Sequence, residues 1–418
     1  MKGWDYIKLA DYCEIFPGLA FDSTKFTSNL ADIHLVKGEN LHQGYIDWGN
    51  AKRWNVADWE NLKKFQLKAN DIVVAMDRPW IEAGLKWSSL TRRDPKALLV
   101  QRVARLRSKK ELHQSYLRHI IGSKLFEGYV KPILTGVNVP HISGTQIGNF
   151  KFSLPPLPIQ CKIAAVLSAY DDLIENNNRR IALLEKMAEE LYREWFVRLR
   201  FPGHEKVKTV KGVPEGWEVK RIGDLANSTM GQSPASEFYN ENGDGLPFNQ
   251  GVGTYGKRFP RRDIYCSSKG RIAEEGDVLI SVRAPVGRLN IADCRMIIGR
   301  GLAALRHKTG YNSYLYYLLN NVFSSEDIIG NGAIFNSVTK DELLGYKVVT
   351  PGEGIIALFE KTAKVIDKKF EFLVKQNSLL ATTRDRLLSR LMSGKINVEN
   401  LEIQFPASMK EEEVTAHA

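Results

Sequence analysis

The chain has 418 residues, and its 59 Lys and Arg against 48 Asp and Glu give a formal net charge of +11. With 43% hydrophobic and 26% charged residues, the composition is that of a folded globular protein and excludes a mainly disordered, collagen-like or membrane-embedded chain. No run approaches the roughly 18 apolar residues of a membrane-spanning helix, and the first residues lack a secretory pattern, so we expect a cytoplasmic protein of two or more domains without a membrane partner.

The four cysteines, Cys13, Cys161, Cys266 and Cys294, form no C-x-x-C pair and have no His partner at zinc-ligand spacing. We therefore predict reduced thiols, with neither a disulfide framework nor a structural metal. The positive charge, together with 8 Trp, 15 Tyr and 18 Phe, suits a partner rich in phosphates. Charge alone does not decide this, because many basic proteins bind no nucleic acid.

In chain order, the sequence presents the same plan twice. Three pairs of segments match in the same order: 4–11 with 217–224, 68–75 with 274–281, and 143–155 with 337–351. In the second pair a polar turn, containing Asp71 or Asp277, feeds a buried strand. In the third pair Thr145 aligns with Thr339, ahead of a strand and a proline. Such ordered repetition predicts an internal duplication whose copies differ in their loops.

After each closing proline the apolar residues recur at alternating steps of three and four, which indicates a long helix with a narrow apolar seam. The seam residues are Ile163, Leu167, Tyr170, Ile174, Ile181, Leu184, Leu191, Phe359, Ile366, Phe370, Leu373, Leu380, Leu387 and Leu391. Each helix should have about 38 residues, or roughly 57 Å at 1.5 Å per residue. An approximate two-fold relation between the halves would make the two helices an antiparallel coiled coil. Asn177 and Asn377 interrupt the seam, and we expect hydrated positions there rather than a register-fixing pair.

The predicted fold class is α+β, with two α/β domains separated by two long antiparallel helices that form a coiled coil, and with a pseudo-two-fold internal repeat. The predicted boundaries are 1–157 for the first domain, 158–200 for the first long helix, 201–353 for a linker and the second domain, 354–396 for the second long helix, and 397–418 for a flexible tail.

Six short motifs are distinctive when they are taken in order. They are LPPLPIQ at 154–160, NRRIALLE at 178–185, MGQSP at 230–234, GLPFNQG at 245–251, GDVLISVRAPVG at 276–287 and GRGLAAL at 299–305. With these motifs the chain resembles the specificity (S) subunits of type I restriction-modification systems. The resemblance covers essentially the whole chain except the tail, but before residue 154 it extends only to the general plan.

The resemblance implies that each domain is a target recognition domain that reads one part of a split site in double-stranded DNA. It also implies that the helix pair holds the two domains apart and docks two methyltransferase (M) subunits. S-adenosylmethionine would then lie on the M subunits, which methylate adenine at N6, while restriction (R) subunits would use ATP and Mg to translocate and cleave DNA. The chain itself would be non-catalytic and would bind no cofactor. Two different domains on one frame fit an asymmetric bipartite target, just as two identical domains fit a palindrome.

The candidate DNA contacts in the second half lie in loops rich in Gly, Pro and polar residues. They are Gln232, Ser233, Ser236, Asn249, Gln250, Thr254, Tyr255, Lys257, Arg258, Arg261, Arg262, Arg283 and Arg288. Asn and Gln can pair with adenine and Arg with guanine, whereas Lys and Ser suit phosphates. The alternative is a solvated basic loop.

The candidate contacts in the first half interleave aromatic and basic groups. They are Trp48, Asn50, Lys52, Arg53, Arg78, Lys86, Arg92 and Arg93. By position Arg78 parallels Arg283, and the basic groups are better suited to phosphates than to bases. Aromatic residues in such a segment belong to a local core more often than to a stacking surface.

Two rival interpretations remain open from the sequence alone. One is a stand-alone DNA-binding protein with the same duplicated frame. The other is an enzyme, because residues 251–257 match the G-x-x-x-x-G-K of a phosphate-binding loop. However, Arg258 stands where such a loop needs Ser or Thr to bind Mg²⁺, and a polar segment precedes it instead of a buried strand. The missing catalytic motifs therefore favour a binding protein.

Overall fold

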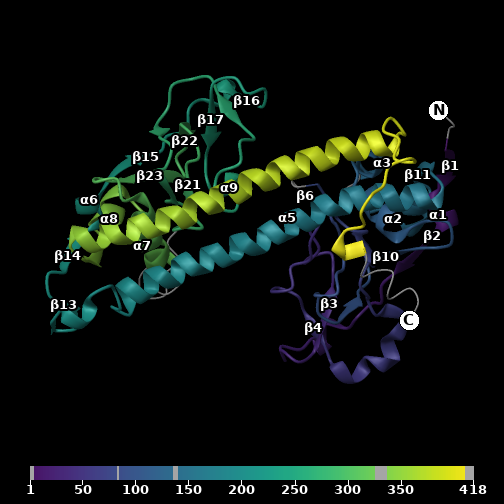
Figure 1. The fold of residues 1–418 in the computed structure, drawn as a ribbon, viewed down its shortest axis with the longest axis horizontal. Helices are drawn as coiled ribbons and strands as arrows, with labels where there is room; N and C mark the ends of the chain where they lie inside the picture. The colour runs from purple at the N-terminus through teal and green to yellow at the C-terminus, as the bar shows by residue number, and fades with distance from the viewer. Residues whose placement is uncertain (1–3, 82–83, 135–139, 325–336, 410–418) are drawn as a thin grey trace. The chain divides into compact units, whose positions relative to one another are not determined.

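The structure is a computed structural model that describes residues 4–81, 84–134, 140–324 and 337–409. Within these residues the chain forms two compact units (Figure 1). The first unit consists of residues 1–177 and 375–418, and the second consists of residues 178–374. Each unit holds one mixed helix and sheet domain and about half of each of two long helices.

The first unit contains a four-stranded antiparallel sheet of order β2-β10-β5-β8, a three-stranded sheet of order β4-β3-β9, and the two-stranded pairs β1-β11 and β6-β7. The strands are β1 (Asp5–Lys8), β2 (Cys13–Pro17), β3 (Ile33–Val36), β4 (Arg53–Trp54), β5 (Ile72–Ala75), β6 (Trp80–Ile81), β7 (Gly84–Leu85), β8 (Trp87–Ser89), β9 (Ala97–Leu99), β10 (Val103–Ser108) and β11 (Lys151–Leu154). The short helices are α1 (Leu9–Tyr12), α2 (Gln114–Ile121), α3 (Lys124–Leu134) and α4 (Gly144–Gly148).

The second unit repeats this arrangement with a four-stranded sheet of order β15-β23-β20-β21, a five-stranded sheet of order β16-β18-β17-β22-β19, and the pairs β12-β13 and β14-β24. The strands are β12 (Thr209–Val210), β13 (Val213–Pro214), β14 (Glu218–Arg221), β15 (Ala226–Met230), β16 (Tyr239–Asn240), β17 (Leu246–Asn249), β18 (Tyr265–Cys266), β19 (Ile272–Ala273), β20 (Val278–Ser281), β21 (Leu289–Ile291), β22 (Met296–Ile298), β23 (Leu302–His307) and β24 (Lys347–Thr350). The short helices are α6 (Ile222–Leu225), α7 (Asn312–Ser324) and α8 (Lys340–Gly345).

The duplication extends to individual hydrogen bonds, which confirms the predicted internal repeat. In the first unit Asp71 accepts from the backbone N–H of Lys68 at 2.7 Å and forms an ion pair with Arg107 of β10. In the second unit Asp277 accepts from the backbone N–H of Glu274 at 2.8 Å, and its ion-pair partner is an arginine of β23. The two polar turns found in the sequence therefore join the same two inner strands of the four-stranded sheet in both copies.

One detail of the predicted alignment was wrong. Ser143 caps α4 and Thr339 caps α8, each in a reciprocal capping box with the residue three positions later. The equivalent of Thr339 is therefore Ser143 and not Thr145. The two are interchangeable because a short side-chain oxygen is what the first turn of a helix needs.

The two long helices are α5 (Leu157–Tyr192), which continues into a π-turn at Arg193–Val197, and α9 (Glu353–Met392). In the first unit Asp171 of α5 forms an ion pair with Arg384 of α9. In the second unit the ring of Tyr192 contacts that of Phe359, with 5.8 Å between the ring centroids. Residues near the end of α5 thus meet residues near the start of α9, and the two helices are antiparallel, as predicted.

The polar interruption of the seam differs from our expectation. Asn177 is buried, and its Nδ2 donates to Oδ1 of Asn377 at 2.9 Å and to Oε1 of Gln376 at 3.0 Å. The two asparagines therefore form a direct pair across the seam, which we had not expected. A buried amide pair of this kind penalises any slipped register, because slippage would leave its donors and acceptors unsatisfied.

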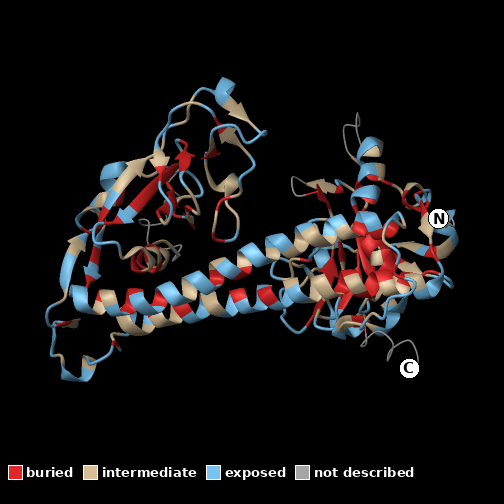
Figure 2. Ribbon diagram, turned by 45° about the horizontal axis from the view of Figure 1, so that its top comes forward, coloured by how far each residue is buried: buried red, intermediate tan, exposed pale blue. Residues whose placement is uncertain are grey.

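Figure 2 shows the buried residues gathered in the domain of each unit and along the facing sides of the helices. The predicted flexible tail departs from this expectation over residues 397–409, because Val398 and Met409 are buried in the core of the first unit. The remaining tail residues, 410–418, lie outside the described residues. All four cysteines are free thiols, and no helix in the described ranges is long and apolar enough to cross a membrane.

The first unit should lose stability as the pH falls below about 6.5. Burial, and to a lesser extent Arg118, lower the pKa of His119 to about 3, and its Nε2 lies 3.2 Å from Oγ of Ser168. His119 therefore binds a proton near pH 6.5 in the unfolded chain but not in the folded unit. Below this pH the free energy of unfolding falls by up to about 1.4 kcal/mol per pH unit. Asp171, 3.8 Å from His119, remains ionised in this range because its own pKa is lowered.

The measurement is the urea midpoint of unfolding between pH 7 and pH 4.5, for the wild type and for His119→Gln. We expect the midpoint of the wild type to fall more steeply with decreasing pH. Equal slopes for the two proteins would show that His119 does not carry the effect.

Candidate nucleic-acid interface

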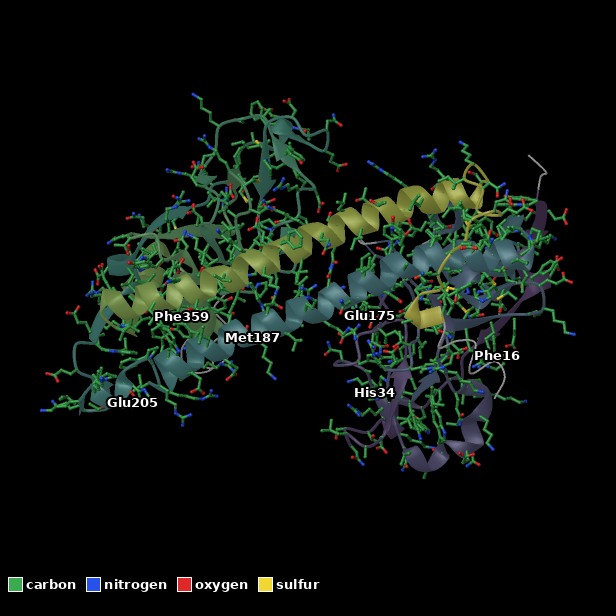
Figure 3. The ribbon with its side chains drawn as sticks, viewed as in Figure 1. Phe16, His34, Glu175, Met187, Glu205 and Phe359 are labelled. Carbon is green, nitrogen blue, oxygen red and sulfur yellow. The ribbon has the colours of Figure 1, made fainter. Side chains whose placement is uncertain are left out.

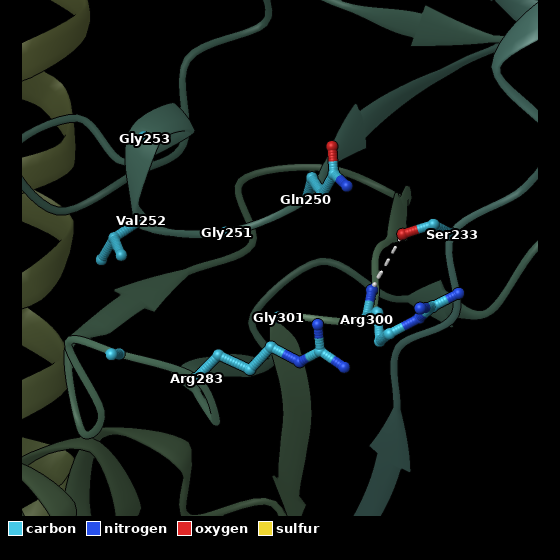
Figure 4. A pocket seen from close by; sticks show the side chains of 9 residues that line it. Ser233, Gln250, Gly251, Val252, Gly253, Arg283, Arg300 and Gly301 are labelled. Atoms are coloured by element: carbon cyan, nitrogen blue, oxygen red, sulfur yellow. Dashed lines mark hydrogen bonds between the residues drawn. The ribbon is translucent and has the colours of Figure 1, made fainter. Parts of the chain in front are cut away.

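The second unit has an open cleft of about 450 Å³ where four strands end. Its walls come from the loops that follow β15, β17 and β20 and from the turn between β22 and β23. The lining residues are Ser233, Gln250, Gly251, Val252, Gly253, Arg283, Ala284, Arg300 and Gly301. Figure 4 shows Gln250, Arg283 and Arg300 entering this cleft from three separate loops. Segments that are separate in the sequence thus create one concave polar surface.

The side chains of this cleft are available to a ligand. Ser233 Oγ accepts from the backbone N–H of Arg300 at 3.2 Å, which holds the β22-β23 turn against the loop after β15. Among the described residues, no acidic group lies within ion-pair distance of the guanidinium of Arg283 or Arg300. Unpaired guanidinium and amide groups are strong hydrogen-bond donors for phosphates and for base edges.

A glycine in the loop after β15 allows a close backbone crossing. A Cβ at Gly231 would lie 2.1 Å from the carbonyl oxygen of Gly299. In the first unit a Cβ at Gly18 would lie 2.2 Å from the carbonyl oxygen of Val100. The two backbones can approach this closely only without a side chain, so the crossing is a second feature that both units share.

The first unit has a cleft of about 750 Å³ at the equivalent strand ends. The lining residues are Phe21, Ser23, Phe26, Lys37, Gly38, Glu39, Asp77, Arg78, Lys86, Val100, Gln101 and Arg102. Two of its cations are in ion pairs: Lys37 lies 3.1 Å from Glu39, and Arg102 pairs with Asp77. Lys86 donates to the carbonyl oxygen of Gly38 at 2.8 Å, and burial together with Arg78 lowers its pKa.

Backbone hydrogen bonds fix the correspondence between the clefts. The N–H of Gly299 donates to the carbonyl of Asn249 in the second unit, and the N–H of Val100 donates to the carbonyl of Val36 in the first. The residues that follow these acceptors, Gln250 and Lys37, are therefore equivalent. Arg300 directly follows Gly299, and Gln101 directly follows Val100, so Arg300 and Gln101 are equivalent as well.

The proposed parallel between Arg78 and Arg283 was off by one residue. Arg283 forms an isolated bridge with Ser337, and the equivalent bridge in the first unit joins Asp77 to His141. Arg283 therefore corresponds to Asp77. Arg78 is the next residue, and it adopts a positive φ of 42° with its N–H bound to the carbonyl of Pro140.

Several predicted contacts of the second half lie outside the cleft because they are used within the fold. Arg258 is 2% exposed and donates to Asp367 of α9 at 2.7 Å. Asn249 is fully buried on β17, and the ring of Tyr255 packs into a small core. In this conformation Arg258, Asn249 and Tyr255 cannot reach a duplex, and we do not retain them as candidate contacts.

The remaining candidates of the second half are nearer the surface. Thr254 Oγ1 donates to the carbonyl of Gly251 at 2.8 Å, Arg261 to that of Gly253 at 2.6 Å, and Arg262 to Asp293 at 2.7 Å. The exposed candidates that do not line the cleft are Gln232, Ser236, Lys257 and Arg288.

Residues 252–254 form a 3-10 turn, and no helix begins at Lys257, so the segment lacks the strand-loop-helix geometry of a phosphate-binding loop.

In the first half the structure brings only Arg78 and Lys86 to the cleft. Trp48 donates from Nε1 to Asp94 at 2.8 Å and packs on a core, and Asn50 donates to Asp47 at 2.7 Å. The other candidates are Lys52, which is exposed, Arg53, which donates to the carbonyl of Leu30, Arg92, which is exposed, and Arg93, which forms an ion pair with Glu175 of α5 at 2.7 Å.

Sequence reasoning missed Lys37, Gln101, Arg102 and Arg300. Arg300 is part of the GRGLAAL motif, but this motif was used only to identify the family resemblance and not to select candidate contacts. The signal that could have found these residues was the repeat itself, if the strands had been aligned by their buried residues. The loop lengths differ between the copies, and this difference hid the alignment.

Comparison with known proteins gives consistent results. The sequence profile of the type I restriction modification DNA specificity domain matches residues 1–186 and 214–355. A Methanocaldococcus jannaschii protein named as the type I restriction enzyme MjaX specificity subunit is 33% identical over 288 residues, which cover 68% of this chain and 67% of that protein. The MjaIX specificity subunit of the same organism is 28% identical over 68% of this chain and 70% of its own length.

Among solved structures, the type I restriction-modification S subunit from M. genitalium aligns over 93% of this chain and 96% of its own length, with a TM-score of 0.55 and 17% identity. At this identity the likeness concerns the fold alone. The fold is thus that of a duplicated protein with two long paired helices. The chain belongs to the type I restriction-modification specificity subunit family, whose members are in general non-catalytic.

Proposed function

We propose that each unit reads one half of a bipartite, asymmetric target in double-stranded DNA, with the cleft at its strand ends facing the duplex. The observation that carries this proposal is the presence of two clefts at equivalent strand ends with different polar linings. A duplicated scaffold places two contact surfaces in the same local setting, and different linings let them prefer different sequences. The domain boundaries proposed from the sequence, 1–157 and 201–353, contain these two clefts.

The helix pair then serves as a spacer that sets the unread gap and as a docking surface for two methyltransferase subunits. Its seam is apolar where α5 meets α9 in the second unit, since Ile181, Phe370 and Leu373 form one buried cluster. The buried amide pair at Asn177 fixes the register of the helices in the first unit. A fixed register is what a spacer of defined length requires.

Docking is supported by a second apolar stripe, on the outside of α9. Leu358, Val365 and Phe372 are exposed at intervals of seven residues, and the same spacing continues to Leu379. On α5, Met187 is also exposed (Figure 3). Apolar residues at heptad spacing suit the packing of a partner helix. In this assembly S-adenosylmethionine belongs to the methyltransferase subunits, and ATP and Mg to restriction subunits.

The proposal is tested by co-expressing the chain with the methyltransferase of the same genome and mapping N6-methyladenine by single-molecule sequencing. We expect one split motif with a fixed gap that disappears when this gene is deleted. An unchanged methylation map, in cells where the two proteins associate, would contradict the proposal. Specific binding by the lone chain would instead favour a stand-alone DNA-binding protein.

Phe372→Glu should weaken association with the methyltransferase about thirtyfold or more, because central apolar contacts of an interface are commonly worth about 2 kcal/mol or more. The binding of the full chain to the purified methyltransferase can be measured by titration calorimetry. Lys364→Gln on the same helix changes the net charge by the same amount and should leave the affinity unchanged. Equal affinities for wild type and Phe372→Glu would place the docking surface elsewhere.

A further inference from the structure

The two clefts share their backbone geometry but differ at three equivalent positions. The first unit has Lys37, Asp77 and Gln101 where the second unit has Gln250, Arg283 and Arg300. Each position lies one or two residues beyond a strand end, and the same backbone contacts recur, so the backbone places the three side chains in the same relation in both units. The differences are therefore chemical and not architectural.

Such differences distinguish base readout from phosphate contact. The phosphate backbone is the same in both halves of any DNA target, so residues that contact it should be donors or cations in both units. Asp77 and Arg283 do not meet this requirement, because a carboxylate in one unit stands at the position of a guanidinium in the other. The other two pairs have donors in both units, and they differ in charge and shape. Side chains that must recognise different bases have to differ between the two units.

The hydrogen-bonding state of these side chains also favours base readout. The side chains of Gln250, Arg283 and Arg300 have no acidic partner within the described part of the second unit. Arg fits the O6 and N7 acceptors of guanine, and Gln fits the N6 and N7 pattern of adenine, each with two hydrogen bonds. The second cleft thus presents side-chain donors without an acidic partner, and such donors suit purine bases.

The three equivalent positions of the first cleft offer fewer uncommitted donors. Lys37 is held by Glu39, and Asp77 is held by Arg102 and by Nδ1 of His141. Gln101 is exposed, and its amide is not committed to an acidic or carbonyl partner within the described residues. The two units therefore present different hydrogen-bond patterns to their half-sites.

We propose that residues 250, 283 and 300 determine which bases the second unit reads, and that residues 37, 77 and 101 do the same for the first. This inference rests on the proposed function, since it assigns specificity within the two clefts. It predicts guanine and adenine among the bases read by the second unit. It also predicts that exchanging one position alters one half of the target and leaves the other half and the gap unchanged.

The test uses the complex of the full chain with its methyltransferase and a library of random DNA duplexes, sequenced before and after binding. The main variant is Arg300→Gln, which gives the second unit the residue that the first unit has. The matched control is Arg295→Gln, which removes the same charge from an exposed side chain that does not line the cleft. Gln250→Ala is a second cleft variant in case Arg300→Gln does not fold.

We expect the wild type to select two sequence blocks with a fixed gap. Arg300→Gln should lower the enrichment of the preferred base at one or more positions of a single block by about tenfold, because one bidentate contact contributes roughly 1–3 kcal/mol of discrimination. Arg295→Gln should select both blocks unchanged. Gln250→Ala should affect the same block as Arg300→Gln.

Failure of the two ideas can be told apart. A wild-type complex that selects no pair of blocks contradicts the proposed function itself. If the wild type selects two blocks and both folded cleft variants keep them unchanged, the assignment of specificity is overturned. It is also overturned if the variants bind all sequences more weakly with the same preferences, since that is the behaviour of a phosphate contact.

Discussion

Replacing Arg258 by methionine is expected to destabilise the second unit by about 3–5 kcal/mol, because it leaves a carboxylate without its buried partner. The guanidinium donates to Asp367 at 2.7 Å and to the hydroxyl of Tyr317 at 2.8 Å. It also lies over the rings of Tyr316 and Phe370, 4.4 and 4.8 Å from their centroids. Burial opposes the charge, but Asp367 and the tyrosines outweigh this effect and raise the pKa of Arg258.

This side chain joins the loop after β17 to α7 and α9, so its loss should loosen the attachment of the recognition domain to the helices within the second unit. The effect is measured as the free energy of urea unfolding, followed by circular dichroism. The double variant Arg258→Met with Asp367→Leu should recover most of the loss, because neither charge remains buried. A single variant as stable as the wild type would show that the cluster around Arg258 does not stabilise the unit.

Lengthening both long helices by one heptad is expected to widen the unread gap of the DNA target by about three base pairs. Seven helical residues rise about 10 Å, and one base pair of duplex rises about 3.4 Å. Residues 174–180 of α5 and 374–380 of α9 are suitable for duplication, because Asn177 and Asn377 pair at their centre. A seven-residue insertion preserves the apolar seam, whereas a shorter one would rotate it.

The gap can be read from the methylated motif of the variant complex. Both sequence blocks should stay the same, because neither cleft is altered. Duplication in α5 alone is the control, and it should reduce stability since the seam of α9 no longer matches. A lengthened pair that methylates the original motif with the original gap would exclude the helix pair as the spacer.

The architecture could be predicted from the sequence to a large extent, whereas the clefts could not. The apolar period of the long helices and the turns at Asp71 and Asp277 follow from local patterns, and both are present in the structure. The limits of the helices differ by only a few residues from the predicted ones. Such elements can be predicted because their signal lies within a single segment of the chain.

The candidate contacts depend on distant segments, and this is why the sequence was a poorer guide to them. Arg258 stands among polar residues and resembles a surface cation, but its partner Asp367 is on α9, 109 residues away. Arg300 and Gln250 come together only because β17 and β22 pair in parallel. Neither relation leaves a local pattern, so loop composition identified Ser233, Gln250 and Arg283 and missed Arg300.

The division of the chain has a consequence for its synthesis. The second unit is a continuous stretch that is complete at residue 374, whereas the first unit needs residues from both ends of the chain. Leu388, Leu391 and Met392 of α9 are part of the same buried cluster as Leu9 near the N-terminus. On the ribosome the second unit can therefore fold while the first still lacks one wall of its core, so the half of the protein that is made first is the last to be finished.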